Sequence, residues 1–135
     1  MPSPRTKEIL VFLNYSAVGG VGFLVDASTV HLLVYLAMMD PYISRVLSYL
    51  LAATVTWYLN RKYTFFSTSK NNKREWLYYL AGNSLGGGIN YLCYAIIVYY
   101  YKDLSYVLLV AVSTGSTIGL AVNYAINKYF VFTRT

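Results

Sequence analysis

The chain has 135 residues, of which 57% are hydrophobic and 12% are charged, and its formal net charge is +6. Soluble domains usually carry about a quarter charged residues. A soluble protein of this composition would have too little polar surface, so the sequence indicates an integral membrane protein.

Four stretches are apolar enough to form membrane helices, and about 20 helical residues cross the roughly 30 Å hydrocarbon core. They cover residues 9–38, 43–66, 76–101 and 104–132. The first run is too long for a secretory signal, and no small-residue cleavage site follows it before Asp40-Pro41. We therefore expect an all-α protein with four transmembrane helices that forms a single membrane domain over residues 1–135.

The basic residues predict the orientation of these helices. Nine of the eleven cations lie near the two termini and the central connection, namely Arg5, Lys7, Arg61, Lys62, Lys70, Lys73, Arg74, Lys128 and Arg134. Short loops rich in Lys and Arg stay in the cytoplasm. Both termini and the central loop should thus be cytoplasmic, in a multi-pass protein of the cell membrane. The positive charge suits anionic lipids, and no nucleic-acid-binding module is present.

The chain also contains an internal repeat. Asn60-Arg61-Lys62-Tyr63-Thr64-Phe65 returns 67 positions later as Asn127-Lys128-Tyr129-Phe130-Val131-Phe132. At the same offset Gly19-Gly20 corresponds to Gly86-Gly87. The sequence predicts a repeat over residues 9–66, a cytoplasmic linker over 67–75 and a second repeat over 76–132. Because each copy contains two spans, the copies should run parallel, with the working surface between them.

Polar and small residues recur every four positions along the second helix of each repeat. The two stripes are Ser48, Ala52, Thr56, Asn60 and Gly115, Gly119, Asn123, Asn127, and Asn90 adds an amide on the third segment. Small residues let helices approach closely and polar ones hydrogen-bond across the contact. Packing accounts for the glycines, whereas the number of asparagines also favours a polar groove containing Thr56, Asn90 and Asn123.

Asp26 is the acidic residue near the middle of the first segment. A charged side chain at the bilayer centre costs about 2.5–3.5 kcal/mol on insertion scales, so a partner, water, a ligand or a proton must offset that cost. A structural alternative is a hydrogen bond to an Asn of a neighbouring helix.

Arg61 and Lys128 end two helices at equivalent places, each directly after an Asn. Two cations converging from the two repeats, supported by Asn60 and Asn127, would form a receptor for a phosphate group. The alternative is that both are anchors that extend to the membrane interface.

No catalytic motif, metal-ligand set or cofactor-binding motif is recognisable in the sequence. We therefore expect a protein that is not an enzyme and that needs no metal or cofactor.

Phe12, the arrangement Gly19-Gly20…Asp26 and the duplicated Asn-basic-x-aromatic-x-Phe endings resemble the GtrA-like family of small four-span membrane proteins. The resemblance covers nearly the whole chain. It implies translocation of polyprenyl-phosphate-linked sugars from the cytoplasmic leaflet for modification of cell-surface glycans, and a polyprenyl-phosphate glycosyltransferase as partner. Lys128 departs from the Arg that is frequent in the second copy.

The resulting hypothesis is a lipid-linked-sugar flippase. Arg61, Lys128, Asn60 and Asn127 would hold the lipid phosphate, and the sugar would meet Asp26, Asn90, Asn123 and Thr56. Four helices enclose little space, so we expect a homo-oligomer. One alternative is a non-transporting anchor or subunit of a glycosyltransferase, and another is a small proton-coupled exporter.

Overall fold

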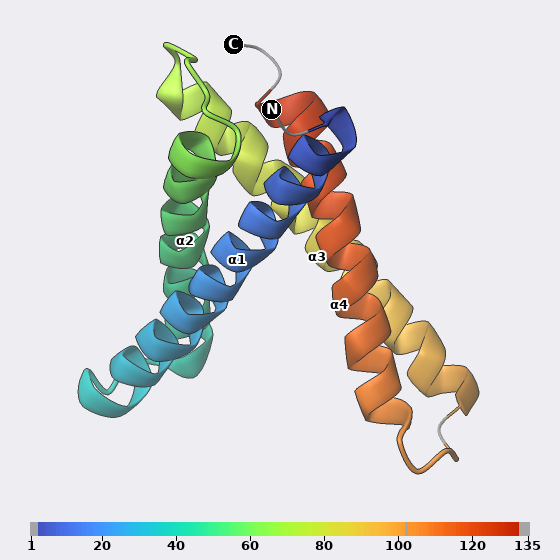
Figure 1. Ribbon diagram of the computed structural model, residues 1–135. Coiled ribbons are helices and arrows are strands. Elements are labelled where there is room, and N and C mark those ends of the chain that lie inside the picture. Colours follow the sequence, from blue (N-terminus) through green and yellow to red (C-terminus); the bar gives the residue numbers. More distant parts are fainter. Residues whose placement is uncertain (1–2, 102, 133–135) are drawn as a thin grey trace. The chain divides into compact units, whose positions relative to one another are not determined.

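A computed structural model describes residues 3–101 and 103–132, which form helices joined by short connections. The chain divides into two compact units, Met1–Thr68 and Ser69–Thr135. In the first unit, α1 (Pro4–His31) continues into a π-helical turn, η1 (Leu32–Leu36), and α2 (Pro41–Leu59) continues into η2 (Asn60–Thr64). In the second unit, α3 (Asn72–Tyr101) is followed by α4 (Val107–Ile126) and η3 (Asn127–Val131). The two helices of each unit run side by side in opposite directions (Figure 1).

Short polar side chains start three of the helices. The Ser3 hydroxyl accepts a hydrogen bond of 3.2 Å from the Thr6 N–H, and Pro4 occupies the first helical position of α1. The Asp40 carboxylate accepts from the Ile43 N–H at 3.1 Å, and the Asn71 side chain accepts from the Arg74 N–H at 3.1 Å. Each acceptor replaces a backbone partner that the first turn of a helix lacks.

The first two helices end in the same way. A wide turn closes with an Ala37 N–H to Leu32 C=O bond of 3.1 Å after α1, and with a Phe65 N–H to Asn60 C=O bond of 2.8 Å after α2. Met38 and Phe66 then adopt positive φ values of 52° and 49°, the left-handed conformation that commonly ends a helix. The sequence did not predict these π-helical turns.

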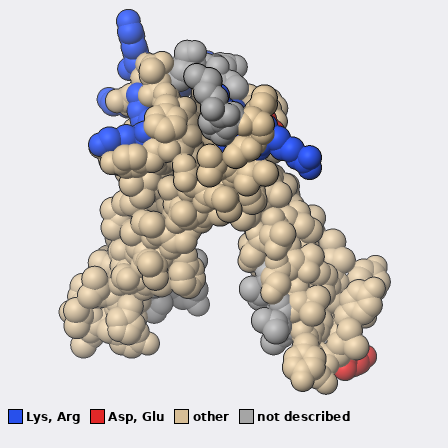
Figure 2. All heavy atoms as spheres, viewed as in Figure 1, with Lys and Arg blue, Asp and Glu red and all other residues tan. Residues whose placement is uncertain are grey.

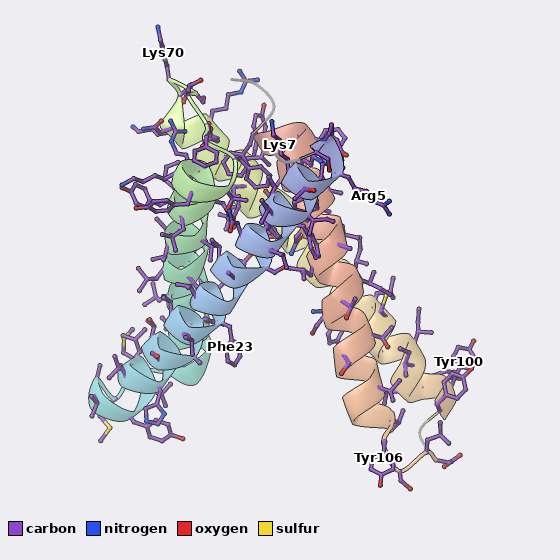
Figure 3. The ribbon with its side chains drawn as sticks, viewed as in Figure 1. Arg5, Lys7, Phe23, Lys70, Tyr100 and Tyr106 are labelled. Carbon is purple, nitrogen blue, oxygen red and sulfur yellow. The ribbon has the colours of Figure 1, made fainter. Side chains whose placement is uncertain are left out.

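Large apolar side chains remain exposed along the outer faces of the helices. Phe23 is 70% exposed on α1 (Figure 3), and Leu85 is 64% exposed on α3. Tyr100 and Tyr106, beside the connection from α3 to α4 (Figure 3), are 72% and 75% exposed. Apolar helix faces of this kind suit a lipid environment, and exposed tyrosines suit its interface.

Among the described residues, one continuous helix, Pro4–Leu36, is by length and composition able to cross a membrane. The four-span arrangement therefore stays a prediction. The Lys and Arg side chains that the structure describes gather at one end of each antiparallel pair, where α1 and α3 begin and α2 and α4 end (Figure 2). Arg45 and Lys102 lie outside the residues whose side chains are described.

Candidate functional site

The polar stripe of the first unit faces α1. Ser44, Ser48, Ala52, Thr56, Asn60 and Thr64 follow one another at four-residue spacing, and all are buried. A methyl group added to Gly22 of α1 would overlap the Thr56 methyl group, so the two helices touch at this point. The Thr56 hydroxyl donates to the Ala52 carbonyl at 2.9 Å. The stripe is thus a helix–helix contact surface, and Thr56 lies within it.

Asp26 has a partner on α2. The Ser48 hydroxyl donates to an Asp26 carboxylate oxygen at 2.7 Å. The structure therefore provides the hydrogen bond that an acid between apolar helices needs, but the donor is a serine and not the asparagine considered from the sequence.

Removing this donor should destabilise the first helix pair. A hydrogen bond to a charged group contributes about 1.5–3 kcal/mol, so we expect Ser48→Ala to lower the free energy of unfolding by about that amount. Asp26→Asn keeps an oxygen that can accept from Ser48 and should cost less. Denaturant unfolding of the purified protein in detergent, followed by circular dichroism, compares the variants. A Ser48→Ala protein as stable as wild type would contradict the assignment.

The second unit has a stripe of the same kind, with Gly115 in place of Ser48 and Gly119 in place of Ala52. Asn90 of α3 packs on Gly115 and Gly119 of α4, where a Cβ added to Gly115 would lie 2.7 Å from the Asn90 carbonyl oxygen. The Asn123 amide lies against Gly86, where a Cβ would overlap it. Asn127 is fully buried and donates to the Asn83 side-chain oxygen at 3.1 Å. The amides predicted to line a groove therefore lie in or beside the contact between α3 and α4.

Arg61 and Lys128 occupy matching places in η2 and η3. The Arg61 guanidinium carbon lies 5.8 Å from the centre of the Trp57 ring, and the Lys128 amine lies 5.7 Å from that of Tyr124. Such cation–aromatic contacts hold a charged group against its own helix. Asn60, directly before Arg61, is 1% exposed. The structure describes each unit by itself, so the convergence of Arg61 with Lys128 stays a prediction.

The comparison with protein families decides the classification. The model of the GtrA/DPMS transmembrane domain matches residues 14–134. The chain belongs to this family. Membership identifies a GtrA/DPMS-type membrane protein and connects it with polyprenyl-phosphate-linked sugars. A search of the curated proteins found no match.

Within this GtrA/DPMS domain, the helices of the two units correspond at two different offsets. Tyr15 contacts Phe65 with ring centres 6.0 Å apart, and Tyr79 contacts Phe132 at 5.9 Å. The phenylalanines are 67 positions apart, but the tyrosines are 64 positions apart. The contact between Gly22 and Thr56 likewise corresponds to that between Gly86 and Asn123.

The predicted correspondence of Gly19-Gly20 with Gly86-Gly87, at an offset of 67 residues, is therefore wrong for the contacts of α1 and α3. These two helices correspond at an offset of 64 residues. At the corrected offset, the counterpart of Asp26 is Asn90. The position that carries an acid in the first unit carries an amide in the second.

The structure shows hydrogen bonds of two residues, Ser48 and Asn83, that could not be predicted from the sequence. The sequence places Ser48 in the polar stripe but does not show which residue of the second helix faces Asp26. No role could be predicted for Asn83 of the third segment, because its bond with Asn127 depends on how the two helices pair. A polar residue within an apolar segment was the available signal for both.

Proposed function

We propose that this GtrA/DPMS-family protein moves a polyprenyl-phosphate-linked sugar from the cytoplasmic leaflet of the cell membrane to the outer leaflet, for modification of surface polysaccharides or glycans. The observation that carries the proposal is the family match over residues 14–134. Translocation of this kind needs no covalent chemistry by the protein, so we propose a transporter and not an enzyme.

In this proposal, Arg61 and Lys128 hold the lipid phosphate on the cytoplasmic side. Both cations are partly exposed, and both follow a buried asparagine in a π-helical turn. Wide turns of this type are frequent at functional sites. Asn60 and Asn127 are buried at the start of each turn, and the cations would extend from the turns toward the headgroup.

The sugar would meet the partly exposed Asp26, Asn90 and Asn123. Thr56 is buried between α1 and α2, with its hydroxyl on the backbone of its own helix, so we assign it to packing. An ionised Asp26 would repel a phosphate, and we therefore propose that it binds sugar hydroxyls or takes part in a proton-linked step.

We further propose four spans with both termini in the cytoplasm. The cations at one end of each helix pair support this orientation. Two helix pairs enclose little space for a sugar, which favours a homo-oligomer, and a polyprenyl-phosphate glycosyltransferase would supply the substrate.

A second candidate is a non-transporting anchor or subunit of such a glycosyltransferase. It is equally compatible with the family match, which names GtrA and DPMS together in one transmembrane domain. In this role the protein would present the lipid to the enzyme and leave the sugar on the leaflet where it was made.

Reconstitution in liposomes separates the two candidates. A fluorescent polyprenyl-phosphate sugar is placed in the inner leaflet, and a membrane-impermeant quencher outside reports its arrival in the outer leaflet. A flippase should increase the rate well above that of empty liposomes. A rate equal to that of empty liposomes would contradict translocation by this protein alone and favour the anchor.

A further inference from the structure

Two adjoining hollows lie on the second unit, beside the start of α3 and the end of α4. The smaller one, of about 140 Å³, is lined by Ser69, Asn71, Arg74 and Glu75. The larger one, of about 450 Å³, is lined by Ala81, Gly82, Leu85, Ile126 and Phe130. Tyr78 and Val131 line both. The smaller hollow, called the polar hollow for its Ser, Asn, Arg and Glu side chains, thus shares two wall residues with a larger apolar one.

A hollow with polar side chains next to an apolar hollow is suited to an amphiphilic ligand, one with a polar head and an apolar chain. The polar hollow has several times the roughly 30 Å³ that a water molecule occupies, enough for a phosphate-sized group. The walls of the larger hollow are almost entirely hydrocarbon and aromatic, and burying an apolar chain there would remove its methylene groups from contact with polar surroundings.

Arg74 supplies the positive charge at the junction. Its Nε–H donates to the Tyr78 hydroxyl at 3.0 Å, and its guanidinium carbon lies 5.3 Å from the centre of the Tyr78 ring. Tyr78 lines both hollows, so these contacts hold the guanidinium beside the point where they meet. A guanidinium binds phosphate oxygens through its remaining N–H groups, with two parallel hydrogen bonds in the best geometry.

Glu75 restricts the charge of the ligand. It is 4% exposed and lines the same polar hollow. A phosphomonoester carries about −1.5 to −2 charges at pH 7, and the glutamate would disfavour the second charge. A phosphodiester carries a single charge, so Glu75 repels it less than it repels a monoester.

We propose that the second unit contains its own binding site for a single-chain lipid phosphodiester. The phosphate binds Arg74, the chain lies in the apolar hollow, and Glu75 selects against the monoester. The isoprenoid nature of the chain rests on the proposed function, whereas the charge and the apolar chain follow from the hollows. A lipid-linked sugar is such a diester, and the lipid phosphate left after sugar transfer is a monoester, so the site favours substrate over product.

The test measures binding to the full chain in detergent micelles by titration calorimetry. The probes are farnesyl methyl phosphate as the diester, farnesyl phosphate as the monoester, farnesol and inorganic phosphate. We expect the diester to bind about fivefold tighter than the monoester, and inorganic phosphate to show no measurable binding. Equal or tighter binding of the monoester would contradict the role of Glu75, and Glu75→Gln should bring the two affinities together.

Two substitutions with matched controls locate the site. Arg74→Gln should weaken diester binding about tenfold or more and leave farnesol unchanged, whereas Lys73→Gln, next to it but outside the hollow, should change neither. Ala81→Phe should fill the apolar hollow and abolish binding of diester and farnesol. Ala17→Phe places the same ring at the corresponding position of α1 and should retain binding.

Unchanged diester affinity in Ala81→Phe would overturn the proposal, because the diester would then bind at another place on the protein. Thermal unfolding of each variant verifies that the helices are intact. The liposome assay keeps the two proposals separate. Diester binding that depends on Arg74, without translocation, would leave this site in place and overturn the flippase. Translocation together with diester binding that is unaffected by Arg74→Gln and Ala81→Phe would overturn the site and leave the flippase in place.

Discussion

Replacing both Arg61 and Lys128 by glutamine is expected to reduce translocation of the lipid-linked sugar roughly a hundredfold or more. Each cation would contribute a charge-assisted contact with the phosphate of about 1.5–3 kcal/mol. Glutamine keeps much of the apolar stem and removes the charge, so packing on Trp57 and Tyr124 should be largely retained. The liposome assay measures the rate, and surface glycosylation in cells provides an independent readout.

The matched control replaces Lys62 and Lys73 by glutamine. Both are exposed cations at the same ends of the two units, so the control removes equal charge without touching the proposed phosphate ligands. We expect near-normal translocation and membrane insertion. A similar loss in both double variants would assign the effect to overall charge, and an unimpaired Arg61/Lys128 variant would show that these cations do not bind the phosphate.

Gly115→Val should destabilise the second unit by about 3 kcal/mol, the largest stability effect that we predict. A Cβ at this position lies 2.6 Å from the Asn90 side-chain oxygen and 2.7 Å from its backbone carbonyl oxygen. A backbone atom cannot move aside as a side chain can, so α4 must separate from α3 to make room for the valine. Inserting extra side-chain volume into a packed contact typically costs 1–3 kcal/mol or more. Helix propensity acts in the opposite direction, because valine is a better helix former than glycine.

Gly87→Val in α3 is the control. A Cβ there meets nothing within 4 Å, so the same substitution should leave stability unchanged or raise it slightly. Thermal unfolding of both variants in detergent gives the comparison. Equal midpoints for Gly115→Val and Gly87→Val would mean that α3 and α4 do not pack through Asn90.

The helical class, the family and the four-residue polar stripes could be predicted from the sequence. Long apolar segments permit little other than helix, and a spacing of four residues places Ser48, Thr56 and Asn60 on one face whatever that face contacts. The family prediction depended on the duplicated Asn-cation endings, and the match over residues 14–134 confirms it.

The pairing of helices could not be predicted in the same way. Gly19-Gly20 and Gly86-Gly87 look alike as letters, but Gly22 is the residue that contacts α2 in the way that Gly86 contacts α4. Helix register depends on which side chains fit opposite each other, and glycine pairs occur at several offsets in this chain. The wide turns at Asn60 and Asn127 were missed because no residue type marks a π-helical bond.

Asp26 in the first unit and Asn90 in the second make the two units chemically unequal, although their helices pack through corresponding contacts. A hybrid built from two copies of the C-terminal half would retain both cationic turns and the glycine contacts, yet it would have no carboxylate at this depth of its helix pairs. Any step that requires a carboxylate at this depth must therefore be carried out by the N-terminal unit.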